Sequence, residues 1–228
     1  EGKTTTLDYR ETAPTGVTAQ HFLKANGKKN RESKDSWHAM GVPGTVAGLF
    51  KAWQSYGSGK LTWQQLVQPA INLADKGFVV NFDLAQLIAA KRYWLLENQA
   101  TKKAYFKSDG SLYQAGELMK RLDLAWSLEQ IAIHGEAAFY RGAIAKKIVA
   151  DMENNHGHID LDDLANYQVI ERPAIIGNYR GYQIASMPPP SSGGVAIVEA
   201  LNILENFPLS QWGKSAKYYH VCLLYTSP

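Results

Sequence analysis

The sequence predicts an α+β chain whose middle is rich in helices. Apolar residues recur at helical spacing between residues 45 and 155, and runs of β-forming residues lie near residues 3–9 and 168–186. Of the 228 residues, 45% are hydrophobic and 20% are charged, which is typical of a globular chain and argues against disorder. This length is enough for one large or two small packed domains.

The N-terminal part is expected to be a strand followed by irregular chain. Lys3–Tyr9 is rich in β-forming residues and should end at Arg10 and Glu11. Polar residues dominate Pro14–Trp37, which favours an exposed excursion over packed structure.

Five longer helices are expected in the middle, because apolar residues repeat there every three or four positions. Thr62 and Gln65 form a capping box for the second helix, and Gly77 should end it. Pro69 lies inside this helix and predicts a kink. The expected helices cover residues 45–57, 62–77, 82–97, 117–134 and 143–155.

The C-terminal part is expected to mix short helices with strands. Asp160, with Asp163 three positions later, should cap a short helix, and Ser191 or Ser192 should cap a longer one. Strands are expected at Gln168–Glu171, Ile175–Tyr179 and Tyr182–Ser186, the last two joined at Arg180 and Gly181.

Charge and motifs exclude several classes of function. The net charge of +3 is small and evenly spread, so we expect no nucleic-acid partner. A single cysteine excludes an intramolecular disulfide, a CxxC redox site and a cysteine-based zinc site. No apolar run is long enough for a membrane span, and the signatures of nucleotide loops, serine hydrolases and zinc proteases are missing. We therefore expect no cofactor.

The histidines predict no metal centre. His156 and His158 follow a helix end and lack an evident third ligand, so we interpret Gly157 between them as a helix cap. The other four histidines are isolated in the sequence and are interpreted as surface or packing residues: His21, His38, His134 and His220.

Two features remain as candidate sites. Arg10 lies where a β-rich run meets a loop, so its guanidinium could hold a ligand carboxylate through two hydrogen bonds. Spacing alone favours an ordinary ion pair instead, with Glu11 or Glu171. The second feature is Ser186–Gly194, in which three prolines precede a Ser-Ser-Gly-Gly helix opening. Such an opening can bind an anion or simply be capped, and composition does not choose between the two.

Several segments, in the same order, resemble the large subunit of the gamma-glutamyltranspeptidases, also called glutathione hydrolases. The resemblance covers about residues 2–221. The matching segments are Leu7–Pro14, Gly41–Gly48, Gln68–Ala70, Ala74–Phe78, Phe139–Gly142, Asp163–Tyr167, Tyr179–Tyr182 and Ser186–Gly194.

The resemblance implies an N-terminal-nucleophile hydrolase of αββα architecture, of which this chain is a helix-rich portion, incomplete without the small subunit. In that family a precursor cuts itself, and the new N-terminal threonine of the small subunit attacks the γ-glutamyl amide to form an acyl-enzyme. Water or an amino acid then accepts the γ-glutamyl group.

The resemblance also assigns roles to two residues. Arg10 would bind the α-carboxylate of glutathione or another γ-glutamyl substrate, which reverses the preference for an ordinary ion pair. Glu11 would orient Arg10 or shape the site. No catalytic residue is expected within this chain, its partner would be the small catalytic subunit, and the complete protein would be periplasmic or secreted.

The seven residues after Val221 do not follow the family pattern. Cys222–Pro228 is interpreted as the translated end of a transposon adapter from a sequencing library, so we expect a native portion of residues 1–221 and a non-native tail of residues 222–228. Without the nucleophile the fragment should be inactive.

Two alternatives remain open. One is a related acylase of the glutaryl or cephalosporin type, or a polyglutamate transpeptidase, since these share the architecture. The other is a non-catalytic binding or scaffold protein.

Overall fold

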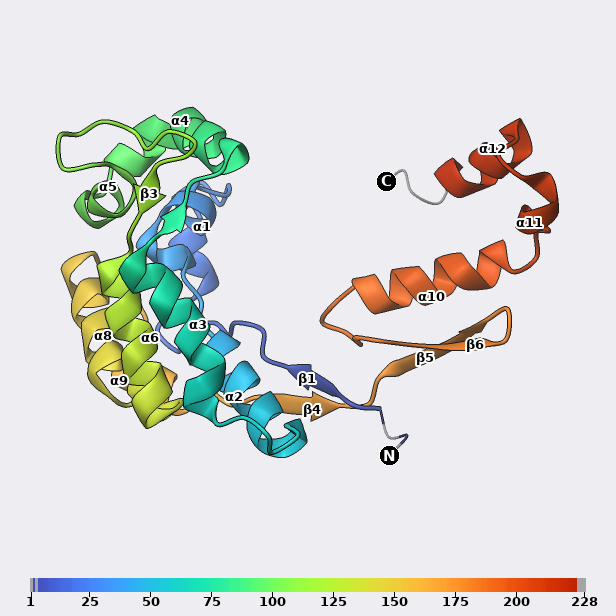
Figure 1. Ribbon diagram of the computed structural model, residues 1–228, viewed down its shortest axis with the longest axis horizontal. Helices are drawn as coiled ribbons and strands as arrows, with labels where there is room; N and C mark the ends of the chain where they lie inside the picture. The colour runs from blue at the N-terminus through green and yellow to red at the C-terminus, as the bar shows by residue number, and fades with distance from the viewer. Residues whose placement is uncertain (1, 3, 225–228) are drawn as a thin grey trace. The chain divides into compact units, whose positions relative to one another are not determined.

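The computed structural model describes residue 2 and residues 4–224 (Figure 1). The chain divides into two compact units. We call Arg10–Tyr167 the helical unit, and the residues up to Tyr9 together with those from Gln168 the terminal unit.

Helices build most of the helical unit. Helices α3 and α6 lie side by side, and a short strand pair, β2 (Phe78–Val79) with β3 (Leu118–Met119), precedes α4 and α6 (Figure 1). The helices of this unit are η1 (Ala19–Phe22), α1 (Glu32–Asp35), η2 (Trp37–Ala39), α2 (Thr45–Tyr56), α3 (Trp63–Lys76), α4 (Phe82–Leu96), α5 (Gln99–Tyr105), α6 (Leu122–His134), α7 (Ala137–Tyr140), α8 (Ala143–Asn154) and α9 (Leu161–Ala165).

Local capping signals correctly predicted both ends of α3 and the start of α9. At α3 the Thr62 side chain accepts from the Gln65 amide while the Gln65 side chain accepts from the Thr62 amide. Gly77 ends the helix with φ +96°, a backbone conformation that residues with a Cβ rarely adopt. Asp160 and Asp163 form the same kind of box at α9. Pro69 lies inside α3, and the kink expected from it stays a prediction.

The helix expected at 117–134 begins later, at Leu122. Leu118 and Met119 instead form β3, which pairs antiparallel with β2, and Met119 is only 1% exposed. The Arg121 amide then donates to the Ala74 carbonyl of α3 at 2.8 Å. Tertiary pairing therefore overrides the helical periodicity of this segment. Helix α5, capped by Asn98, was not predicted.

The core of the helical unit includes two apolar clusters of buried residues. One joins β2, β3, α4 and the end of α5, with Val80, Ile88, Leu95, Phe106 and Met119 buried. The other lies between α6, α7 and α8, with Ile131, Ala138 and Ile144 buried against Trp63 and Val46. The second cluster connects the middle helices to the segment that opens α2.

The terminal unit combines two strand pairs with three helices. Strand β1 (Thr6–Asp8) pairs antiparallel with β4 (Ile170–Arg172), and β5 (Ile175–Tyr179) forms a hairpin with β6 (Tyr182–Ser186). Both hairpin strands have the predicted bounds. Strand β1 is shorter than the predicted Lys3–Tyr9, and β4 begins and ends later than the predicted Gln168–Glu171. The helices are α10 (Gly193–Leu204), α11 (Leu209–Trp212) and α12 (Ala216–Leu224). Helix α12 includes the first residues of the expected tail, and residues 225–228 lie outside the described residues.

An ion pair between buried Asp8 and partly exposed Arg172 joins β1 to β4. Asp8 is 8% exposed, and its carboxylate accepts from Arg172 Nε at 2.8 Å. The Thr6 hydroxyl donates to the Arg172 carbonyl at 2.9 Å. These contacts stabilise a pair of strands that is only three residues long.

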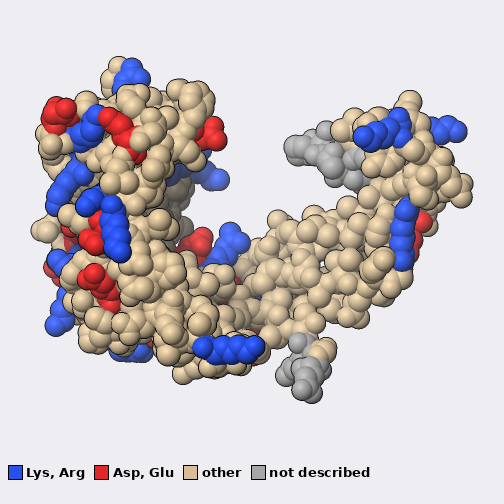
Figure 2. All heavy atoms as spheres, in the orientation of Figure 1, with Lys and Arg blue, Asp and Glu red and all other residues tan. Residues whose placement is uncertain are grey.

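The terminal unit leaves apolar surface uncovered. Helix α10 packs along the β5–β6 hairpin, where Val198 meets Gly177. The face of α10 and the hairpin in Figure 2 carries few charged side chains. Ile176 of β5 and Val195 and Ile197 of α10 are each more than 40% exposed. This exposed apolar surface agrees with the expectation that the chain is one portion of a larger protein and is incomplete without the rest.

None of the helices in the described part of the chain has the length and apolar character needed to cross a membrane.

Candidate functional site

Arg10 and Glu11 lie next to each other at the start of the helical unit, directly after β1 and Tyr9. Their side chains are 58% and 63% exposed, and Arg10 Nε lies 3.8 Å from Glu11 Oε1. The ion pair that spacing favoured is therefore present. A pair that is this exposed contributes little stability, so it does not prevent the guanidinium from binding a carboxylate.

The main chain is held at the Arg10 carbonyl and again at Thr12. The Tyr167 hydroxyl donates to the Arg10 carbonyl at 2.9 Å. Two residues further, Thr12 and Val42 form a bridge, with the Thr12 amide donating to the Val42 carbonyl at 3.3 Å and the reverse bond at 2.8 Å. Val42 is 1% exposed. An exposed charged side chain thus extends from an anchored backbone.

Gly41 allows this bridge to form. A Cβ at Gly41 would lie 2.9 Å from Glu11 Cγ and 3.3 Å from the Thr12 carbonyl. Any side chain at Gly41 would therefore push Glu11 and Thr12 away. The Gly41–Gly44 segment, which leads into α2, packs directly against the segment that carries Arg10.

Tyr140 holds the C-terminal end of the Gly41–Gly44 segment and the start of α2. It is 3% exposed, and its hydroxyl donates to the Pro43 carbonyl at 2.7 Å and accepts from the Ala47 amide at 3.2 Å. Gly44, the N-cap of α2, has no side chain that could accept a hydrogen bond, so Tyr140 caps this helix from α7. Burial raises the pKa of Tyr140 to about 12, which keeps its hydroxyl protonated.

The sequence did not single out the roles of Tyr140 and Tyr167. Both residues fall in segments that resemble the family, but no role was assigned to them. Tyr167 and Arg10 are 157 positions apart, so no spacing pattern could have connected them.

The Ser186–Gly194 segment lies in the terminal unit. Gly194 is buried, and a Cβ there would overlap the Met187 carbonyl oxygen, so the chain is closely packed where α10 begins. Of the two predicted caps, Ser191 Oγ accepts from the Gly193 amide at 3.4 Å, and Ser192 is the N-cap residue without a side-chain bond. The hydrogen bond from the Gly193 amide to Ser191 is long, so this capping is weak. The contacts at the start of α10 do not assign an anion-binding role to the segment.

His21 and His38, which are isolated in the sequence, come together in the structure as packed side chains. Together with His158 they form a cluster whose ring centroids lie 4.4–5.6 Å apart. His38 Nδ1 and His158 Nε2 are 2.7 Å apart, a hydrogen-bond distance. Burial, followed by the charges of His21 and His38, lowers the pKa of His158. The segments are distant in sequence, which is why spacing did not reveal them.

Within the part of the chain that the structure describes, no three His, Cys, Asp or Glu side chains are arranged to hold a metal ion. His134 and His220 lie outside the cluster and are exposed.

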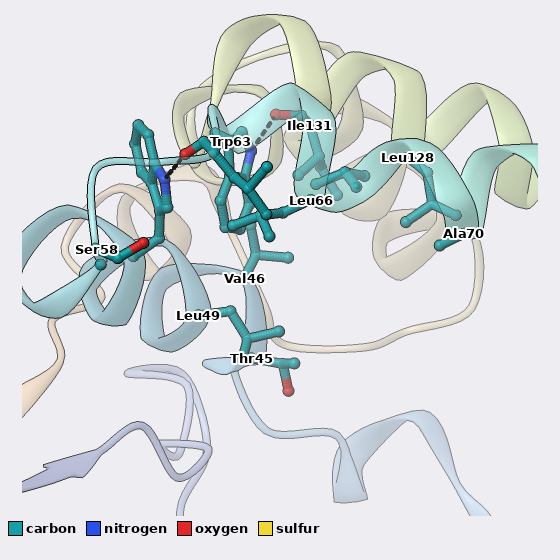
Figure 3. Close-up of a pocket in the computed structure, with 13 residues that line it drawn as sticks. Thr45, Val46, Leu49, Ser58, Trp63, Leu66, Ala70, Leu128 and Ile131 are labelled. Atoms are coloured by element: carbon teal, nitrogen blue, oxygen red, sulfur yellow. Dashed lines mark hydrogen bonds between the residues drawn. The ribbon is translucent and has the colours of Figure 1, made fainter.

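An apolar pocket of about 620 Å³ lies between α2, α3 and α6 (Figure 3). The indole of Trp63 donates to the Ile131 carbonyl at 2.9 Å and closes one side, while Val46, Leu49 and Leu66 contribute apolar walls. Its lining residues carry no carboxylate, histidine, lysine or arginine. The pocket therefore offers apolar contact rather than acid–base chemistry.

Comparison with known proteins identifies what the chain is similar to. The model of the family described as gamma-glutamyltranspeptidase matches residues 1–224. The glutathione hydrolase proenzyme of Escherichia coli K12 is 45% identical over 213 residues, which cover 93% of this chain and 36% of that protein. The chain thus spans about a third of the length of that relative.

Solved structures show the same likeness in three dimensions. Helicobacter pylori gamma-glutamyltranspeptidase superposes with a TM-score of 0.93 at 39% identity, over 98% of this chain and 64% of that one. A cephalosporin acylase from Bacillus halodurans superposes with a TM-score of 0.85 at 27% identity, over 97% and 41% of the two chains. These structures confirm the predicted N-terminal-nucleophile hydrolase class of fold, of which the chain covers only part.

Proposed function

Because the chain belongs to the gamma-glutamyltranspeptidase family, we propose that it is part of the large subunit of an enzyme that cleaves γ-glutamyl amide bonds. Glutathione and its conjugates are the proposed donors. The γ-glutamyl group would pass to water or to the amine of an amino acid or peptide.

Arg10 is the proposed contact for the α-carboxylate of the donor. One observation carries this assignment: an exposed guanidinium extends from a main chain that Tyr167 holds at the Arg10 carbonyl and Val42 holds at Thr12. A planar guanidinium donates two parallel hydrogen bonds to a carboxylate, and a fixed backbone lowers the entropy lost on binding. Glu11, 3.8 Å from Arg10 Nε, would orient the guanidinium.

The chemical step would use a nucleophile from outside this chain. We propose an N-terminal threonine on a small subunit, released when the precursor cuts itself. Its hydroxyl would attack the amide carbonyl while its α-amine takes the proton, and the acyl-enzyme would then react with water or an amine. Export to the periplasm or outside the cell is part of the same proposal.

The test uses the complete two-subunit enzyme that contains this chain. Arg10→Ala should raise the KM for a chromogenic γ-glutamyl anilide about 100-fold, because charged hydrogen bonds to the carboxylate are lost. Arg10→Lys should recover part of this loss, since lysine keeps the charge but not the paired geometry. Arg92→Ala, at an exposed arginine on α4, is the matched control. An Arg10→Ala enzyme with unchanged KM would reject the assignment.

The acylase alternative is supported by the Bacillus halodurans structure, but less well than the gamma-glutamyltranspeptidase activity is by the Helicobacter pylori structure, and its test needs a second substrate. A glutaryl anilide keeps the distal carboxylate of a γ-glutamyl anilide but lacks its α-amine. Both substrates should depend on Arg10, so their relative kcat/KM in the unmodified enzyme decides between the two activities. Faster cleavage of the glutaryl compound would support the acylase. No cleavage of either compound would support a non-catalytic role.

A further inference from the structure

Tyr167 lies where its hydroxyl can hold the main chain of Arg10 in place. Its hydroxyl donates to the Arg10 carbonyl at 2.9 Å, and its amide donates to the Leu164 carbonyl at 3.2 Å. Leu164 is fully buried, and Arg141 Nη2 donates to the Ala165 carbonyl at 2.6 Å. The end of α9 therefore fixes the main chain from which the Tyr167 ring extends.

The ring of Tyr167 is also held in place. It stacks on the ring of Tyr140 with a centroid distance of 5.5 Å and an interplanar angle of 10°. Tyr140 cannot easily move, since it is buried and its hydroxyl bonds both Pro43 and Ala47. A swing of Tyr167 away from Arg10 would thus lose both the stacking and the hydrogen bond.

The two tyrosines connect two segments that are already in contact. Tyr140 bonds Ala47 at the start of α2 and Pro43 just before the helix, and Tyr167 bonds the Arg10 carbonyl. The Thr12–Val42 bridge joins those segments directly. The peptide between Arg10 and Thr12 is consequently bonded at both ends, while the Arg10 side chain stays 58% exposed.

We propose that Tyr167 is a positioning residue for substrate binding, which acts by holding the main chain of Arg10 and is itself held by Tyr140. This inference rests on the proposed function of Arg10. Tyr167 touches the backbone of the binding residue, so its hydroxyl should affect how well the donor binds and leave the chemical step unchanged.

The test is Tyr167→Phe in the complete two-subunit enzyme. The phenyl ring keeps the stacking on Tyr140 and removes the hydrogen bond to the Arg10 carbonyl. We expect the KM for the γ-glutamyl anilide to rise about fivefold, the change that follows the loss of one ordinary hydrogen bond, with kcat within about twofold of the unmodified enzyme. Tyr93→Phe, which removes an exposed hydroxyl from α4, should change neither constant.

A double variant separates positioning from general stability. If Tyr167 acts through Arg10, Tyr167→Phe should raise KM much less in an Arg10→Ala background than in the unmodified enzyme. Equal effects in both backgrounds, or a parallel fall in kcat and thermal stability without a KM change, would overturn the proposal.

The outcome also distinguishes this proposal from the function of Arg10. If Arg10→Ala leaves KM unchanged, the carboxylate contact fails and the role of Tyr167 fails with it. If Arg10→Ala weakens binding but Tyr167→Phe does not, only the positioning role fails. Should Tyr167→Phe not accumulate, Tyr140→Phe must raise KM in its place, because it loosens the ring on which Tyr167 stacks, and an unchanged KM there overturns the proposal.

Discussion

Replacing Tyr140 by phenylalanine should lower the free energy of unfolding of the helical unit by about 2 kcal/mol at neutral pH. The hydroxyl bonds the Pro43 carbonyl at 2.7 Å and the Ala47 amide at 3.2 Å, and phenylalanine fills the same space without either bond. Ala47 is 4% exposed, so water cannot easily replace the lost acceptor. A buried group left without a partner costs about 1–3 kcal/mol, and the more apolar ring offsets part of the two losses.

Two measurements report this loss. Urea unfolding followed by far-UV circular dichroism gives the change in free energy. Amide exchange resolved by mass spectrometry should show faster exchange at the start of α2, at Thr45–Gly48, and little change in α4. Tyr93→Phe, at a side chain that is 71% exposed, is the control and should stay within about 0.5 kcal/mol of the unmodified protein. A Tyr140→Phe protein as stable as this control would refute the capping role.

Alkaline pH provides an independent check on the same hydroxyl. Because the pKa of Tyr140 is raised from 10.0 to about 12 in the folded state, the unfolded chain loses this proton first. Its contribution is fully present below pH 10 and is lost as pH rises toward 12. The stability difference between the unmodified protein and Tyr140→Phe should therefore shrink across this range. A difference that stays constant would show that the hydroxyl is not buried as described.

Two further predictions concern the histidine cluster and the uncovered apolar face. Since the pKa of His158 is lowered from 6.5, the unfolded state takes up a proton more readily and the folded state should lose stability as pH falls below about 6.5. His158→Leu should reduce that loss in pH-dependent urea unfolding, and an unchanged pH profile would contradict the interpretation. The isolated chain should self-associate through α10 and its hairpin, so Ile197→Glu should lower the mass seen by light scattering, whereas a monodisperse unmodified monomer would disprove this.

The helix ends were largely predictable because their signals are local. The Thr62–Gln65 box at α3 and the Asp160–Asp163 box at α9 each need only residues three positions apart, and the structure confirms both. The β5–β6 hairpin followed from the β-forming runs on either side of Arg180 and Gly181. Leu118 and Met119 were assigned wrongly to a helix, since their partner strand lies about 40 positions earlier in the chain.

The sequence by itself determined the helix-rich α+β class, the bounds of most long helices and the resemblance from which Arg10 and Glu11 were predicted as binding residues. Only the tertiary structure brought Tyr167 to the carbonyl of Arg10, Tyr140 to the start of α2, and His21, His38 and His158 into one cluster. Caps and periodicity depend on neighbours within a turn or two of helix, which a sequence displays directly. The Tyr140–Ala47, His38–His158 and Tyr167–Arg10 contacts join residues 93, 120 and 157 positions apart, and only the packing of the whole helical unit decides which of them meet.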